Sequence, residues 1–104
     1  MQMQSMLLLG LTLTVGSLAQ AAAPPTPALM GEVNGILSYC KSIDRRDEDR
    51  FEKLGRSLSQ GLSRHDLESR EKDQNYRTNF GVMQSVFRSM SPDDALQLCR
   101  GAIK

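Results

Sequence analysis

The chain has little of the chemistry from which catalytic and metal sites are usually built. Its 104 residues include one histidine, two cysteines and no tryptophan. It contains no glycine-rich phosphate loop, no nucleophile elbow and no metal-binding motif. Two cysteines without a cluster of histidines do not form a zinc site. We therefore expect a protein that is not an enzyme, with no catalytic residues, no bound metal and no cofactor.

The single histidine, His65, is the nearest approach to a catalytic group. Ser63 and Asp66 beside it supply the residue types of a hydrolytic triad. Triad members converge from distant parts of a fold, however, whereas residues along one helical turn do not meet at a point. The pattern therefore predicts a surface histidine, with Ser63 as the cap of a short helix.

The chain also lacks an excess of charge of one sign. It has 13 basic and 12 acidic residues, a formal net charge of +1. This balance gives no field that would attract nucleic acid, anionic lipid or a strongly acidic partner, and we expect no nucleic-acid binding. Arginine outnumbers lysine among the basic residues. Either this reflects a recognition surface, where arginine is enriched, or it reflects a genomic preference.

Charge is absent altogether before Glu32, and residues 1–23 have the pattern of a secretory signal peptide. Residues 7–18 form an apolar run that is too short to span a bilayer. Small residues place the cleavage site after Ala23 or, alternatively, after Ala21. We expect a periplasmic or secreted protein whose domain covers residues 24–104, with no stable membrane insertion after cleavage. The alanine-rich cleavage region favours a bacterial periplasm.

Cys40 and Cys99 are the only cysteines, and each falls on the apolar stripe of a predicted helix. In an exported chain this arrangement predicts one structural disulfide. The alternative is a redox-active pair, which usually has close spacing and an accessible, electropositive site. A domain this small has a marginal core, so a covalent link between its two ends is expected.

The clearest structural pattern is a stripe of large apolar residues at helical spacing between residues 73 and 90. It contains three of the five aromatic residues in the chain: Tyr76, Phe80, Met83, Phe87 and Met90 form the stripe. We expect this helix to be the centre of the core, with Phe80 and Met83 buried. The alternative is one continuous helix over residues 63–90.

Helix start and stop signals divide the remainder of the chain. Asp44 and Asp47 are interpreted as a capping pair for the second helix, which ends at Gly61. Gly31 and Gly35 either let another helix approach closely or are merely tolerated, at a cost of up to about 1 kcal/mol each relative to alanine. The fold class is all-α, a small bundle of four to five short helices stapled by one disulfide, with expected helices over 27–43, 44–61, 63–70, 73–90 and 92–103.

These features favour a small exported, non-catalytic binding or interaction protein whose partner is another envelope or secreted protein. If the end helices cover only part of the central stripe, an apolar patch that includes Met90 is exposed. Arg77 and Arg88 would rim this patch and form the partner-binding surface. The alternatives are a small secreted enzyme or effector that uses carboxylates, and a structural accessory subunit of an envelope complex.

In outline, the small size, export signal, cysteine pair and helical pattern resemble two known groups. One is the small periplasmic acid-stress chaperones, and the other is the secreted helical immunity proteins that neutralise bacterial toxins. The resemblance implies a chaperone-like, immunity-like or inhibitor-like binding function. It concerns architecture and places no motif on this sequence, so it assigns no site residues.

Overall fold

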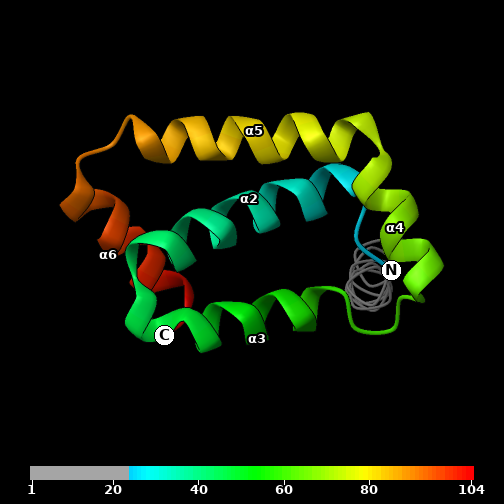
Figure 1. Cartoon of the computed structure of the whole chain (residues 1–104), viewed down its shortest axis with the longest axis horizontal. Helices are drawn as coiled ribbons and strands as arrows, with labels where there is room; N and C mark the ends of the chain where they lie inside the picture. Colours follow the sequence, from blue (N-terminus) through cyan, green and yellow to red (C-terminus); the bar gives the residue numbers. More distant parts are fainter. Residues whose placement is uncertain (1–23) are drawn as a thin grey trace, which may run out of the picture.

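The computed structural model describes residues 24–104, which are all-α (Figure 1). The predicted signal peptide and its cleavage sites therefore lie outside the described residues. Within residues 24–104 there are five α-helices, one 3₁₀ turn and no strand. The elements are α2 (Pro27–Ile43), η1 (Arg45–Asp47), α3 (Glu48–Leu58), α4 (Arg64–Lys72), α5 (Gln74–Arg88) and α6 (Pro92–Ala102).

Side-chain caps start four of these helices where the sequence predicted. The Ser63 hydroxyl accepts a hydrogen bond from the Asp66 backbone N–H at 3.0 Å, and the Ser91 hydroxyl accepts one from Asp94 at 3.2 Å. Thr26 caps α2 in the same way. Asp73 has extended backbone dihedrals and accepts from the Asn75 N–H at 2.8 Å, so the chain breaks between α4 and α5. The alternative of one continuous helix over residues 63–90 is therefore wrong.

The start of the second helix differs from the prediction. Asp44 makes no capping hydrogen bond; a 3₁₀ turn follows it, and α3 begins only at Glu48. Asp47 also makes no capping bond and instead lies 3.9 Å from the Arg50 guanidinium. The capping-pair interpretation is wrong because the side chain of Asp44 points into the protein interior, where it pairs with Arg100.

The central element is α2, not the predicted α5. In Figure 1, α2 runs between α5 on one side and α3 on the other, with α6 at one end and α4 at the other. It contacts every one of these helices. Its apolar and small residues lie around much of its circumference, whereas α5 buries one side and leaves Val82 and Val86 exposed on another. The helix with apolar and small residues on most sides, α2, therefore lies at the centre of the bundle. It has fewer aromatic residues than α5.

Two glycines set how closely α2 and α5 approach each other. A Cβ atom on Gly31 would overlap the backbone carbonyl oxygen of Tyr76. A Cβ on Gly35 would lie 2.7 Å from the carbonyl oxygen of Phe80, closer than such atoms pack. Of the two expectations for these glycines, close approach of another helix is confirmed.

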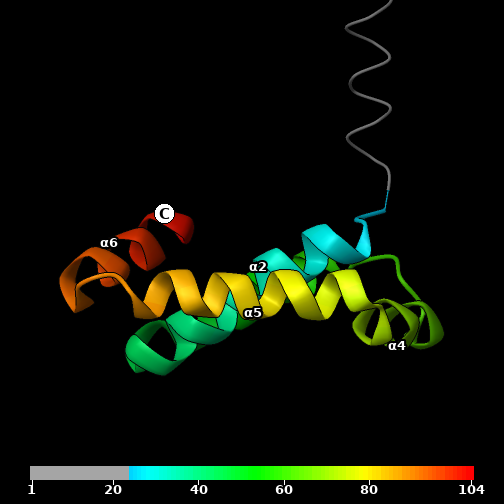
Figure 2. The same cartoon turned by 90° about the horizontal axis from the view of Figure 1, so that it is seen from above.

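The core is small and is centred on the disulfide. Its buried hydrophobic residues come from α2, α3, α5 and α6, and Phe87 is the one fully buried member of the predicted stripe. Phe80 and Met83 are only partly buried, so the expectation that both are buried core is wrong. Figure 2 shows α5 lying along α2, and Phe80 lines an open groove beside α2 and α3, whereas Met83 packs against the core from its edge. The core residues are Met30, Leu37, Cys40, Phe51, Phe87, Ala95 and Cys99.

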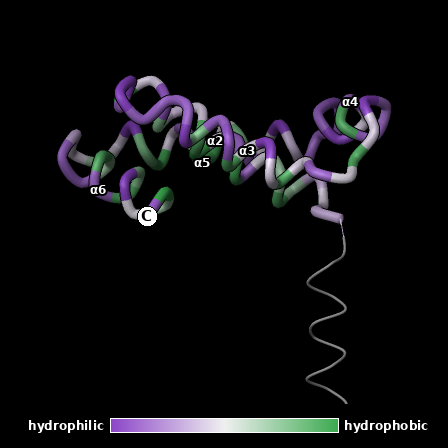
Figure 3. The backbone as a smooth tube through the Cα atoms, turned by 90° about the horizontal axis from the view of Figure 1, so that it is seen from below, coloured by the Kyte–Doolittle hydropathy of each residue, from purple (hydrophilic) through white to green (hydrophobic). Residues whose placement is uncertain are grey.

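The polar helix α4 closes one end of the molecule. Figure 3 shows hydrophobic residues gathered where α2, α3 and α5 run together, whereas α4 is mostly hydrophilic. None of its residues is buried, and Leu67 is its one strong apolar residue. Arg70 ties it to the start of the domain, because its Nε donates a hydrogen bond to the Pro25 carbonyl at 3.0 Å.

Candidate binding surface

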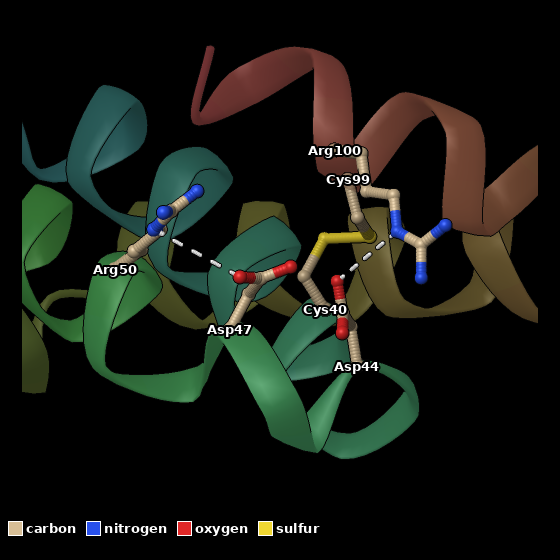
Figure 4. A network of polar contacts seen from close by, with 6 residues as sticks. All are labelled: Cys40, Asp44, Asp47, Arg50, Cys99 and Arg100. Atoms are coloured by element: carbon tan, nitrogen blue, oxygen red, sulfur yellow. Dashed lines mark ion pairs between the residues drawn. A yellow bond between two sulfur atoms is a disulfide. The ribbon is translucent and has the colours of Figure 1, made fainter.

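The predicted disulfide is present between Cys40 on α2 and Cys99 on α6 (Figure 4). The two Cα atoms are 5.5 Å apart, and both residues have no exposed surface. A reductant or partner thiol would have to reach a sulfur atom through the core. Burial on this scale favours the structural interpretation over a redox-active pair.

Beside the disulfide, Asp44 and Arg100 form an ion pair that sequence reasoning missed. The Arg100 Nε lies 3.5 Å from Oδ2 of Asp44, and Asp44 is only 5% exposed. Figure 4 shows the two side chains directed toward each other next to the sulfur bridge. The signal was available, because Arg100 follows Cys99 directly and Asp44 lies one helical turn beyond Cys40. Bonding the two cysteines brings these neighbours together.

A groove runs between α3 and the end of α6, and we call it the α3–α6 groove. One half, of about 340 Å³, has Leu54 and Ile103 on opposite walls. The other half, of about 700 Å³, reaches η1 and shares Arg50, Ile103 and Lys104 with the first. The full lining is Arg46, Asp47, Asp49, Arg50, Lys53, Leu54, Ser57, Arg100, Ala102, Ile103 and Lys104.

Leu54 is an accessible apolar residue of this groove. It is 37% exposed on α3, and Ile103 is partly exposed after α6. Arg50, Lys53 and Lys104 line the same part of the groove. The α3–α6 groove thus combines an apolar floor with a basic rim.

A second groove, of about 440 Å³, lies between α2 and α3 with Phe80 of α5 at one side. Its apolar lining is mostly unavailable, because Leu37 and Phe51 are buried. Its charged lining residues are Lys41, Glu52 and Arg56. The Arg56 guanidinium lies 3.9 Å from the Glu52 carboxylate within the groove. This second groove therefore offers a partner less accessible apolar surface than the α3–α6 groove.

Arg77 and Arg88, the predicted rim of a binding patch, are both exposed on α5. The guanidinium of Arg77 donates to the Lys72 carbonyl at 3.1 Å, and that of Arg88 donates to Oε1 of Gln84 at 3.0 Å. Met90 is partly buried and packs against the core, so it adds little to an exposed patch.

The exposed apolar residues of α5 are ones that the sequence analysis did not select. Val82 is 51% exposed, and Val86 is exposed one turn later. At about 100° per residue, Val82 lies roughly 140° around the helix from Arg77. The structure therefore does not bring the exposed valines and the predicted arginine rim onto one side of α5.

The residues considered for other chemistry remain separate. His65 is exposed in the first turn of α4, where Ser63 serves as a cap. Within residues 24–104, the histidine, cysteine and acidic side chains form no group of three or more that could hold a metal ion. No helix in this part of the chain has the length and apolar character needed to cross a membrane.

Comparison with known proteins gives no match: no family model, no curated protein and no solved structure is similar to this chain. The outline resemblance to acid-stress chaperones and immunity proteins therefore gains no support from similarity. Any functional argument depends on the surface of the domain itself.

Proposed function

We propose that this is a small exported, non-catalytic binding protein that presents a preformed groove to another envelope or secreted protein. The observation that carries the proposal is the α3–α6 groove, where Leu54 and Ile103 are accessible between two helices. The disulfide fits export to a periplasmic or extracellular location, because such bonds persist in oxidising compartments.

The groove is suited to binding because its walls are already positioned. Leu54 lies within α3, and Ile103 follows directly after α6, which the Cys40–Cys99 bond attaches to α2. A partner that covers these side chains gains apolar burial without first ordering the walls, so less entropy is lost on binding. Accessible apolar side chains with a charged rim are typical of interaction sites.

The side of α5 that carries Arg77 and Arg88 remains a second predicted partner-binding surface. Both guanidinium groups are exposed, and each is held by one hydrogen bond within the helix or its neighbour. This surface has less apolar area beside it than the α3–α6 groove, since the exposed valines lie on the other flank of α5. We therefore rank it below the groove.

Capture from the exported proteins of the source organism tests the proposal. The disulfide-bonded protein is immobilised, and bound proteins are identified by mass spectrometry. We expect Leu54→Asp to abolish capture of a specific partner, whereas Leu98→Asp, on an exposed apolar residue of α6 outside the groove lining, should retain it. Arg77→Glu with Arg88→Glu tests the α5 surface in the same way.

The same experiment separates the alternative functions. Hydrolytic turnover by the purified protein with no partner captured would favour a small secreted enzyme or effector that uses carboxylates. A stoichiometric complex that persists through purification would favour a structural accessory subunit of an envelope complex. A partner that exchanges during washing and is lost with Leu54→Asp supports the binding protein proposed here.

A further inference from the structure

We propose that the α3–α6 groove accepts an acidic segment of another exported protein, one that carries apolar side chains beside its carboxylates. This inference rests on the proposed binding function and adds the chemistry of the partner. It depends on the charges of the rim, the apolar floor and the position of the few carboxylates in the lining.

The rim beside the apolar floor is wholly basic. Arg50, Lys53 and Lys104 line this half, and none of its lining side chains is a carboxylate. Lys53 and Lys104 form no ion pair within residues 24–104. The contact of Arg50 with Asp47 is long, at 3.9 Å, and the Arg50 side chain remains 70% exposed. Three cations so placed attract carboxylates and repel a basic partner.

The floor excludes a simple inorganic anion as the full occupant. Leu54, Ala102 and Ile103 offer apolar surface between the cations. A phosphate or sulfate ion would leave this surface in contact with water, whereas a leucine or phenylalanine of a peptide would cover it. A segment with both kinds of group satisfies the rim and the floor together.

The other half of the groove argues against nucleic acid. It adds Arg46 and Arg100, but Arg100 is already paired with Asp44, and Asp47 and Asp49 also line this half. A nucleic-acid backbone has regularly repeated phosphates and would meet these two carboxylates as it followed the groove. A peptide can confine its acidic residues to the end near Lys53 and Lys104.

The shape argues against a membrane surface. Leu54 and Ile103 lie between two helices, and the long side chains of Arg50 and Lys53 stand beside them. A flat bilayer can contact the cationic ends but cannot enter the groove to cover the floor. Burial of both residues requires a narrow occupant such as a peptide segment.

The probe is a fluorescein-labelled peptide in which leucine and glutamate alternate, titrated into the disulfide-bonded exported protein. Binding is followed by fluorescence anisotropy, and the site is mapped by backbone amide shifts in nuclear magnetic resonance spectra. We expect the shifts to centre on Leu54, Ile103 and Lys104. Replacing every glutamate by lysine, or every leucine by serine, should weaken binding by about tenfold or more.

Two double variants with the same change in net charge provide the decisive comparison. Lys53→Glu with Lys104→Glu reverses two charges in the groove, and Arg64→Glu with Lys72→Glu reverses two on α4, which belongs to neither proposed binding surface. All four side chains are exposed, and circular dichroism checks that each variant keeps its fold. We expect about a tenfold loss of peptide affinity in the groove variant and less than about a twofold change in the α4 variant.

Equal losses in the two variants would overturn the inference, because they would show an effect of net charge alone. Amide shifts on α5, or groove-dependent binding of phosphatidylglycerol vesicles without peptide binding, would also overturn it. If a natural partner is captured through Leu54 yet the acidic peptide does not bind, the binding function stands and the acidic-segment inference fails. If neither binds, both fail.

Discussion

Asp44 and Arg100 are paired at 3.5 Å across the junction between the end of α2 and α6, beside the disulfide. Asp44 is buried, whereas Arg100 is half exposed, and Oδ2 of Asp44 has no hydrogen-bond partner in residues 24–104. The pair thus neutralises a buried carboxylate with a cation that reaches in from the surface.

Removing the cation should be harmful. We expect Arg100→Ala to lower the free energy of unfolding by about 1–3 kcal/mol, because it leaves a buried charged acceptor without a partner. Adding Asp44→Asn to this variant should restore part of the loss, since a neutral amide costs less to bury than a carboxylate. Urea denaturation of the wild type, the two single variants and the double variant measures the coupling. Equal stability of Arg100→Ala and the wild type would show that the pair contributes nothing.

The helix crossing at Gly31 gives a second prediction. Gly31→Ala should destabilise the domain by about 1–3 kcal/mol or more, because the new methyl group overlaps the Tyr76 carbonyl and forces α2 and α5 apart. Gly81→Ala is the matched control on α5, where a Cβ meets nothing within 4 Å. Higher helix propensity should make that variant more stable by up to about 1 kcal/mol. Opposite shifts in melting temperature are expected, and shifts of the same sign would contradict the packing argument.

The disulfide gives a third prediction. The bonded cysteines are 59 positions apart, and the chain-entropy model assigns roughly 4 kcal/mol to a loop of this size. That value is comparable with the whole stability of a small domain. Cys99→Ser, or reduction of the wild type, should therefore lower the melting temperature sharply. Thiol titration of the unreduced, denatured protein should find no free thiol, and two free thiols would show that the bond does not form.

The fourth prediction concerns processing. The exported protein should begin at Pro24, or at Ala22 if cleavage follows Ala21, because both sites follow small residues after an apolar run. Intact-mass analysis of protein recovered from the periplasm or medium distinguishes the two. Protein that retains residues 1–23 after export would show that this segment is not a cleaved signal.

Much of the fold was predictable because its signals are local. Ser91 followed by Pro92 starts α6, and Asp73 separates α4 from α5, by hydrogen bonds within a few residues. The disulfide was predictable because only one pairing of two cysteines exists. Such features depend on chemistry that the linear sequence displays directly.

Features that depend on distant partners were predicted poorly. Asp44 has the sequence context of a cap, but its carboxylate pairs with Arg100, 56 positions away. Phe80 has the spacing of a core residue, but it lines the open groove between α2 and α3 and stays partly exposed. In both cases local pattern was correct for the backbone, and tertiary packing decided the environment of the side chain.

The candidate binding groove was not predictable from composition. The near balance of charges in the whole chain argued against an acidic partner, yet the fold gathers Arg50, Lys53 and Lys104 around one apolar floor. These residues come from α3 and from the end of the chain after α6. The net charge of the whole chain averages basic and acidic regions together. A local cluster of basic residues is therefore visible only in the folded structure.

The attachment of α6 has a consequence for when the domain could become active. Of the other helices, α2 is the one against which α6 mainly packs. The Cys40–Cys99 bond joins α6 to α2. In the dithiol form, no disulfide would hold α6, and Ile103 directly after it, in place across the groove from Leu54. Reduction of this bond should therefore loosen α6 against α2 and weaken binding of the acidic peptide in the α3–α6 groove. If the protein is exported as proposed, oxidation after export would raise its affinity for a partner.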